Sequence, residues 1–289
     1  MNAICSMEKY IQCGRFRLPM ANSAAHRPLV MGILNVTPDS FSDGGSHPSL
    51  DQVLDHAEAM IAAGVDIIDI GGESTRPGCT PVTLEVELQR VMPVLYALRD
   101  CGKPLSIDTY KPLVMREAQI AGVDMINDVQ GFRASGAIAA VAQGDCGLCI
   151  MHMQNTPETM QIQPHYTDIV DELDAFFLER VTTMQQAGIS QGRLMLDVGF
   201  GFGKSVAHNV TLLQKQSHFE RQFSLPMLAG LSRKSMIGAL TGKPVEQRLA
   251  GSLAGMLASV SAGARIVRVH DVAETVDALA VWHAVQYAN

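Results

Sequence analysis

Short apolar runs recur along the chain, and nearly every run ends at a residue that can hydrogen-bond or ionise. Runs of this length without polar alternation are typical of parallel strands buried on both faces. The pattern predicts eight strands with polar ends: 29–34 before Asn35, 66–70 with Asp69 near its end, 104–107 before Asp108, 124–126 before Asn127, 147–151 before His152, 193–196 before Asp197, 226–231 before Ser232 and Lys234, and 266–267 before Arg268 and His270.

Segments with helical periodicity lie between these runs. Examples are Leu50 to Ala63, Leu84 to Arg99, Pro112 to Ala121, Tyr166 to Ala187 and Val245 to Ala262, each closing at or near a glycine. This alternation predicts an α/β protein, a closed (β/α)8 TIM barrel, with an open doubly wound sheet as the alternative. In a barrel the strand ends meet on one rim, which would bring together Asn35, Asp69, Asp108, Asn127, Asp197, Lys234 and Arg268. An open sheet would scatter several of these residues along its edge.

The first residues predict no targeting or membrane segment. Residues 1–28 carry Glu8, Lys9, Arg15 and Arg17 and lack the unbroken apolar core of a signal peptide. Tyr10 to Leu18 predicts a short β-hairpin that plugs the bottom of the barrel. Residues 1–9 are expected to be a tail, and residues 10–289 a single domain. No apolar run in the sequence has the length of a membrane span.

Composition and net charge restrict the kinds of molecule that the protein is expected to bind. The apolar content of 47% is enough for a large core, and the net charge of −7 argues against binding nucleic acid. The six cysteines have no disulfide spacing and indicate reduced thiols in a cytoplasmic protein. Cys146 and Cys149 form a C-x-x-C that enters a strand, which disfavours a redox role. Gly251 and Gly255 indicate close helix packing.

A glycine-rich segment follows the sixth run. It contains Gly203-Lys204-Ser205, but Val198 stands where a Walker A loop needs glycine, and Lys204 stands where a dinucleotide-binding loop needs one. What remains is a flexible loop that exposes Phe200 and Phe202 near Asp197. Such a loop can pack against a flat aromatic ligand.

Two polar loops are candidate lids over the expected pocket. One runs from Asn35 to Gly45, and the other from Asp69 to Gly78 and includes Arg76, which suits an anionic substrate. Ordinary surface turns are the alternative. Two long polar loops on the rim that carries the site favour lids.

The ends of the last two strands favour an anion site. Ser232 to Ser235 leads into a helix, and Arg268 and His270 add positive charge nearby, in the region where barrels often bind phosphate. Taken alone, Arg268 could cap a helix or pair with Asp271. Taken with Lys234 and Asn35, it indicates a diphosphate site with a magnesium ion. The other histidines considered, His56, His165, His208 and His283, lack zinc spacing and are interpreted as structural or surface residues.

Asp108, Asn127 and Asp197 place carboxylates and an amide at the pocket floor. Carboxylates on a barrel rim can indicate acid–base chemistry or a glycosidase pair. The chain has few of the aromatic platforms that sugar sites use, and its one tryptophan, Trp282, lies in the last helix. A carboxylate beside an amide also matches the hydrogen-bonding edge of a pterin or purine.

Several motifs together carry a resemblance to a known family. They are Met31 to Gly45, Gly71 to Gly78, Ser106 to Thr109, Ile126 to Asp128, Met151 to Gln154, Gly199 to Lys204, Ser232 to Ser235 and Arg268 to His270. From about residue 10 to its end, the chain resembles the bacterial dihydropteroate synthases of the pterin-binding enzyme family. The resemblance implies a folate-pathway transferase and sulfonamide target that joins 6-hydroxymethyl-7,8-dihydropterin diphosphate to 4-aminobenzoate, giving 7,8-dihydropteroate and diphosphate.

The same resemblance assigns roles by motif. It implies that the pterin is held by Asp108, Asn127, Met151, Asp197, Phe202 and Lys234. It implies that the diphosphate is held by Asn35, Thr75, Arg268 and His270, with Asn35 as the ligand of Mg²⁺. It implies that 4-aminobenzoate is framed by Phe41, Thr75, Arg76, Pro77, Lys234 and Ser235, while Asp43 orients its amine. The catalytic set is then Asp108, Asp43, Lys234, Arg268 and His270. A homodimer built on barrel helices is also implied.

Some features depart from the family pattern. Val198 replaces a common proline, which is expected to loosen the loop after Asp197, and Tyr110 and Gln130 to Phe132 also differ. None of these changes removes an expected ligand. Two alternatives are a corrinoid-protein methyltransferase using methyltetrahydrofolate and a non-catalytic pterin-binding protein. The Thr75 and Arg76 lid and the Ser232 to Ser235 segment favour the synthase over both.

Overall fold

The strands close into a barrel. The computed structural model describes residues 10–20, 23–37, 49–76 and 78–287. Eight parallel strands follow one another around the ring: β10 (Ala264–Val269), β3 (Leu29–Asn35), β4 (Ile67–Gly71), β5 (Leu105–Asp108), β6 (Met125–Asp128), β7 (Gly147–Met151), β8 (Leu194–Asp197) and β9 (Met227–Ala229). The predicted (β/α)8 barrel is confirmed, and the open sheet is excluded because β10 pairs with both β3 and β9.

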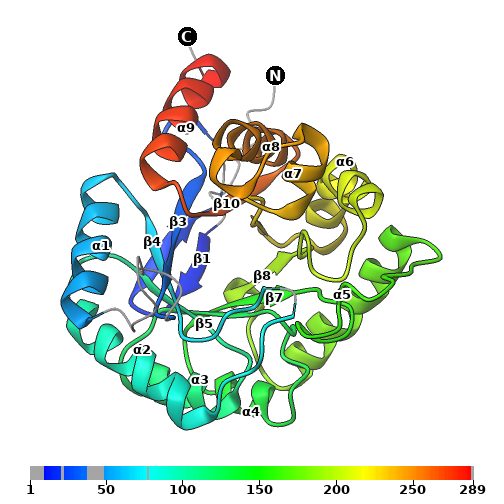
Figure 1. The fold of residues 1–289 in the computed structure, drawn as a ribbon. Coiled ribbons are helices and arrows are strands. Elements are labelled where there is room, and N and C mark those ends of the chain that lie inside the picture. The colour runs from blue at the N-terminus through cyan, green and yellow to red at the C-terminus, as the bar shows by residue number, and fades with distance from the viewer. Residues whose placement is uncertain (1–9, 21–22, 38–48, 77, 288–289) are drawn as a thin grey trace, which may run out of the picture.

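Helices surround the strands as an outer ring (Figure 1). They are α1 (Leu50–Ala62), α2 (Leu84–Leu98), α3 (Pro112–Ile120), α4 (Ala137–Val141), α5 (Ile169–Gln186), α6 (Val206–Phe223), α7 (Ser235–Thr241), α8 (Leu249–Ser261) and α9 (Val272–Tyr287), with 3-10 turns η2 (Gln191–Arg193) and η3 (Val245–Gln247). None of the helices in the described ranges combines the length and apolar content needed to cross a bilayer.

Two predicted helices differ from the observed ones. The helix expected from Tyr166 begins at Ile169, because the Asp168 carboxylate caps it by accepting from Val170 N and Asp171 N. The helix expected over Val245 to Ala262 is broken at Arg248 into η3 and α8. Arg248 turns back to donate from Nε to the Lys243 carbonyl at 3.1 Å and from Nη1 to the Arg233 carbonyl at 3.1 Å.

The barrel interior is filled at the N-terminal ends of the strands. One apolar cluster joins inward side chains of the strands, such as Met31, Ile67 and Met125, to Ile11 and Leu18 of the hairpin formed by β1 (Tyr10–Cys13) and β2 (Phe16–Pro19). The hairpin therefore closes this end, as predicted. The expected tail, residues 1–9, lies outside the described residues.

The hairpin turn is fixed against the barrel by one buried carboxylate. Asp124, at the start of β6, accepts hydrogen bonds from Arg15 N, Nε and Nη2 at 2.9 to 3.1 Å and from Leu105 N at 3.0 Å. Gly14 has a φ of +50° at the turn, and a Cβ there would lie 2.7 Å from Asp124 Oδ1. Glycine is therefore required where the hairpin approaches the barrel.

The C-x-x-C and the G-x-x-x-G of the sequence both lie in tightly packed parts of the structure. Cys146 and Cys149 are both buried thiols, and burial raises the pKa of Cys146 to about 12. This burial leaves little thiolate for redox chemistry.

Gly251 and Gly255 face α7, where a Cβ on Gly251 would lie 2.5 Å from Ile237 Cγ2. The glycines therefore allow α8 to pack closely on α7.

Candidate active site

A cavity of about 560 Å³ opens at the C-terminal ends of the strands. The barrel register explains why polar residues from different strands meet there, since Asn35, Gly71, Asp108 and Asn127 are successive partners across β3, β4, β5 and β6. The predicted site residues that line the cavity are Asn35, Thr75, Arg76, Asp108, Asn127, Met151, Asp197, Phe202, Lys234, Ser235, Arg268 and His270. Three others, Phe41, Asp43 and Pro77, lie outside the described residues.

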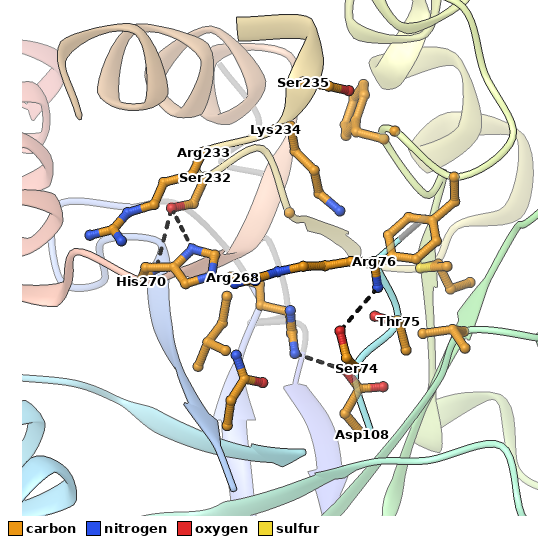
Figure 2. Close-up of a pocket in the computed structure, with 18 of the residues that line it drawn as sticks. Ser74, Thr75, Arg76, Asp108, Ser232, Arg233, Lys234, Ser235, Arg268 and His270 are labelled. Carbon is orange, nitrogen blue, oxygen red and sulfur yellow. Dashed lines mark hydrogen bonds and ion pairs between the residues drawn. The ribbon is translucent and has the colours of Figure 1, made fainter. Parts of the chain in front are cut away.

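Arg268 joins two carboxylates at the floor of this cavity, and Figure 2 shows its contact with one of them, Asp108. Its Nε donates to Asp69 Oδ2 at 2.6 Å, and its Nη2 donates to Asp108 Oδ2 at 2.8 Å. Burial tends to lower the pKa of Arg268, but the two carboxylates raise it above its usual value. The alternative pairing of Arg268 with Asp271 is wrong, because Asp271 binds the Arg233 guanidinium instead.

Asp69 corrects one expectation about the rim. It is fully buried and does not line the cavity. In the strand register it pairs with Ile33 and Ser106, two residues before the layer that contains Asn35 and Asp108. Asp69 therefore lies one layer below the rim, where it contacts the pocket residues from beneath.

Asp108 and Asn127 face the cavity in defined orientations. Burial raises the pKa of Asp108 above the usual carboxyl range, with Arg268 acting in the opposite direction and Asp69 adding to the rise. Asn127 Nδ2 donates to Asp69 Oδ2 at 3.3 Å. Asn127 Oδ1 and Asp108 Oδ1 are buried acceptors without a partner in the described part of the chain. Both oxygens are available to a ligand with N–H donors.

The glycine loop after β8 forms a second wall. Asp197 Oδ1 accepts from Gly199 N at 2.7 Å, and Phe202 packs with Met151, Met153 and other apolar residues. The expectation that Phe200 and Phe202 are exposed is wrong, because their exposed fractions are 1% and 9%. They nevertheless touch the cavity, so an aromatic wall stands beside the Asp197 carboxylate.

Lys234 crosses the cavity toward this wall. Its Nζ lies 4.0 Å from the centroid of the Phe202 ring, a cation–π contact. Burial, helped by the charge of Arg268, lowers the pKa of Lys234 to about 8, while Asp197 and Asp108 act in the opposite direction. Lys234 therefore loses its proton at a lower pH than an exposed lysine does.

His270 contributes hydrogen bonding rather than charge. Burial, with Arg268 and Arg233 nearby, lowers the pKa of His270 to about 3, so the expectation of positive charge at this residue is wrong. Ser232 Oγ accepts from His270 N at 3.2 Å and lies 3.0 Å from His270 Nδ1 (Figure 2). The Ser232 hydroxyl is placed to donate to Nδ1 of the neutral ring, and that hydrogen bond favours the tautomer with its proton on Nε2.

The second candidate lid, from Asp69 to Gly78, is anchored by contacts that could not be read from the sequence. Glu73 accepts from Val82 N at 3.0 Å, from the Tyr110 hydroxyl at 2.8 Å and from Lys111 Nζ at 2.5 Å. Lys111 also binds Glu87 at 2.5 Å. Glu73 thus ties both ends of the loop that carries Thr75 and Arg76. The sequence signal was an acid inside the Gly71 to Gly78 motif, but its partners are distant in sequence.

The residues present fit a magnesium ion only as a companion of diphosphate. In the described ranges, no group of three or more His, Cys, Asp and Glu side chains could hold a metal ion. Asn35 lines the cavity, and its amide oxygen lies beside Gly71 at the end of β4. Magnesium commonly combines one or two protein oxygens with phosphate oxygens and water. The Asn35 amide oxygen beside the expected diphosphate position would satisfy that chemistry.

Comparison with known proteins defines the class. A family model described as pterin binding enzyme matches residues 31–270. The chain therefore belongs to the pterin-binding enzyme family.

Within this family, the similar proteins are dihydropteroate synthases. The Escherichia coli (strain K12) dihydropteroate synthase is 50% identical over 258 residues, which cover 89% of this chain and 91% of that protein. A Xanthomonas albilineans dihydropteroate synthase structure with 4-aminobenzoic acid has a TM-score of 0.90 at 48% identity and covers 98% of this chain and 100% of its own. A Burkholderia cenocepacia structure complexed with 7,8-dihydropteroate has a TM-score of 0.86 at 50% identity, covering 96% and 97%.

Proposed function

We propose that the protein is a dihydropteroate synthase, which transfers the pterinylmethyl group of 6-hydroxymethyl-7,8-dihydropterin diphosphate to the amine of 4-aminobenzoate. The observation that carries this proposal is one cavity with acceptors at its floor and anion-binding donors on its side. Asp108 and Asn127 supply the acceptors, and Arg268 and His270 supply the donors. The relatives solved with 4-aminobenzoic acid and with 7,8-dihydropteroate support the same substrates.

The pterin ring belongs at the cavity floor. Its N–H groups would donate to Asp108, Asn127 and Asp197, whose oxygens face the cavity from three strands. Met151 and Phe202 would lie against the ring faces, and the Lys234 ammonium would donate to a ring acceptor. A flat ligand with both donors and acceptors suits this combination of acids, amide and aromatic wall.

The diphosphate belongs beside Arg268 and His270. Binding there would let the guanidinium contact phosphate oxygens in a bidentate manner, while neutral His270 donates from Nε2 and Thr75 and Asn35 close the site from the rim. Bound at Asn35 together with the diphosphate, magnesium would supply positive charge against the departing oxygens.

The second substrate belongs nearer to solvent. Arg76 and Ser235 are exposed at the mouth of the cavity, where they can bind the carboxylate of 4-aminobenzoate. Lys234, between this region and the floor, would contact both substrates. Phe41, Pro77 and Asp43 are expected to complete this pocket, and Asp43 would orient the amine.

The chemistry follows from charge placed at both ends of the breaking bond. The carbon–oxygen bond breaks with its electron pair leaving on diphosphate, which Arg268 and His270 stabilise. The positive charge left on the dihydropterin lies beside Asp108, whose carboxylate form stabilises it. The amine lone pair of 4-aminobenzoate then forms the carbon–nitrogen bond, and the proton lost from the nitrogen passes to solvent. A closed lid anchored through Glu73 would keep water from the cation.

The proposal is tested by following diphosphate and dihydropteroate formation together. The purified protein is given magnesium and dihydropterin diphosphate, with and without 4-aminobenzoate. Formation of dihydropteroate only when both substrates are present is expected. Pterin binding without turnover would favour a binding protein, and methyl transfer from methyltetrahydrofolate would favour the corrinoid-protein methyltransferase.

Asp108→Asn tests the role of the floor carboxylate. Loss of the charge is expected to lower kcat by about 100-fold or more, as for other groups that stabilise transition-state charge, while pterin affinity changes much less. Steady-state kinetics and calorimetric pterin binding make the comparison. An equal loss in both quantities would contradict this role.

Two further expectations from the resemblance, a homodimer and a cytoplasmic location, stay predictions. The α8 helix, whose small residues allow close packing, is compatible with a helical interface between copies. Sedimentation velocity of the purified protein tests the oligomeric state directly.

A further inference from the structure

The ammonium of Lys204 is buried under the glycine loop and has no role in the condensation proposed above. Its Nζ lies 3.0 Å from His152 Nδ1, 3.2 Å from the His152 carbonyl oxygen, 3.0 Å from the Gly199 carbonyl oxygen and 3.0 Å from the Phe202 carbonyl oxygen. The side chain is almost completely enclosed, with 3% of Lys204 exposed. Four acceptors from two loops therefore converge on one cation.

This environment is an unusual one for a lysine. Burial lowers the pKa of Lys204 to about 7, and Asp197 is the nearby charge that raises it. Burial also lowers the pKa of His152 far below its usual value, so the ring is neutral and its Nδ1 can accept a hydrogen bond. Burying a cation among uncharged acceptors costs free energy. This cost is accounted for if the hydrogen bonds of Lys204 hold in place a segment that shapes the cavity.

What they hold is the loop that carries part of the pocket wall. Gly199 donates from N to Asp197 Oδ1 at 2.7 Å, and Phe202 lies under the Lys234 ammonium. The loop is pressed against the end of β7, because a Cβ on Gly199 would lie 2.0 Å from the His152 carbonyl oxygen. The positions of Asp197 and Phe202 therefore depend on the same short segment.

A phosphate-binding role for this lysine does not fit the structure. Gly203-Lys204-Ser205 matches only the last three residues of a phosphate loop, and the Lys204 ammonium points at backbone carbonyls and is enclosed. Ser205 Oγ accepts from His208 N at 3.1 Å as the N-cap of α6. Both polar side chains of the motif are thus engaged in holding the backbone.

We propose that Lys204 is a positioning residue of the pterin site, whose ammonium ties the glycine loop to the end of β7 and thereby sets Phe202 and Asp197 against the pterin ring. The inference rests on the proposed function, because it takes this cavity wall to be the pterin site. It adds a residue that does not touch the substrate but determines the position of those that do.

The test compares Lys204→Met with the exposed control Lys243→Met. Calorimetry with 6-hydroxymethyl-7,8-dihydropterin gives both the Kd and the number of sites per chain, and steady-state kinetics gives the KM of each substrate. Lys204→Met is expected to raise the Kd and the pterin KM by about tenfold or more, since several charge-assisted hydrogen bonds are lost. The KM for the arylamine substrate and the number of sites are expected to match those of the control.

A structural role alone would give a different result. It would reduce the number of binding sites through loss of folded protein but leave the Kd of the remaining sites unchanged, and that result overturns the proposal. Lack of dihydropterin binding by the unsubstituted protein would instead contradict the proposed function. The two failures are therefore distinguishable.

Two milder variants keep the test decisive if Lys204→Met does not fold. Lys204→Arg keeps the charge, and Tyr166→Phe removes the hydroxyl that donates to the Gly203 carbonyl at 2.9 Å, at the other end of the same loop. Each is expected to raise the dihydropterin Kd severalfold without changing the KM for the arylamine substrate. Unchanged Kd values in both variants would overturn the proposal.

Discussion

At the scale of single residues, hydrogen bonding decides what His270 can offer a ligand. Its ring is uncharged because burial and two neighbouring guanidinium groups disfavour the imidazolium. The Ser232 hydroxyl lies 3.0 Å from Nδ1, where donating its proton favours the tautomer with the ring proton on Nε2. A residue that the sequence analysis took as a source of positive charge is therefore a directed neutral donor.

Ser232→Ala is expected to weaken diphosphate binding by about three- to tenfold, the effect of one lost hydrogen bond. Without the hydroxyl, the imidazole is free to adopt the tautomer that presents no proton at Nε2. The Ki of diphosphate as a product inhibitor measures the change, with Ser261→Ala on the exposed end of α8 as control. A dihydropterin Kd that shifts as much as the diphosphate Ki would contradict a role confined to His270.

The titration of Lys234 predicts how kcat/KM changes at alkaline pH. Its pKa is lowered to about 8, so the ammonium is present below this pH and is lost as the pH rises through it. If the charged form binds the substrates, kcat/KM falls above about pH 8 by a factor of ten per pH unit. In Lys234→Arg, the guanidinium stays charged throughout, and the alkaline limb is expected to disappear. A limb that persists in this variant would assign it to another group.

At the scale of elements, the packing of α8 on α7 depends on which glycine faces the stiff part of Ile237. A Cβ on Gly251 would lie 2.5 Å from Ile237 Cγ2, whereas a Cβ on Gly255 would lie 3.4 Å from the more mobile Cδ1. The first contact is a clash and the second is an ordinary van der Waals contact. The same substitution should therefore have opposite effects at two positions one helical turn apart.

Gly251→Ala is expected to destabilise the protein by about 1 to 2 kcal/mol, because overpacking exceeds the gain in helix propensity. Gly255→Ala, the matched control, is expected to be neutral or slightly stabilising. Thermal or urea unfolding of both variants measures the difference. Equal stability of the two would mean that α7 moves aside without cost.

The strands and helices also show how much of the fold could be predicted from the sequence. The strands were predicted within a few residues because each is a continuous apolar run, and their polar ends met on one rim because parallel strands in a barrel share a direction. The depth of Asp69 was missed, since a rim residue and one a layer below differ only in strand register. Register is set by neighbouring strands rather than by the run itself.

Other misses have the same long-range origin. The break at Arg248 depends on carbonyls of Lys243 and Arg233, and the burial of Phe202 depends on a loop folded around Lys204. Helical periodicity and apolar character are local properties, whereas these contacts join separate segments. The resemblance to a family named the site residues, but it did not reveal these supporting contacts.

At the scale of the whole molecule, the two ends of the barrel have different tasks. The polar cavity lies at the C-terminal ends of the strands, and the hairpin and the Arg15–Asp124 pair close the N-terminal ends. In barrels of this kind, residues at the closed end act on stability rather than on catalysis. Substitutions at the two ends should therefore change different measured quantities.

Asp124→Asn is expected to lower the free energy of unfolding by about 2 to 3 kcal/mol, because a buried carboxylate with four donors loses its charge. Both KM values are expected to stay unchanged. Asp100→Asn, at a largely exposed carboxylate, serves as control. A change in KM without a change in unfolding midpoint would contradict this separation of the two ends.

The closed N-terminal end of the barrel affects how ligands enter and leave the cavity. Among the described residues, β1, β2 and the apolar cluster block one end of the barrel, so ligands exchange with solvent at the rim. With the pterin at the floor and the arylamine beside exposed Arg76 and Ser235, the outer ligand stands in the escape path of the inner one. The residence time of the pterin is then set by how often the arylamine dissociates.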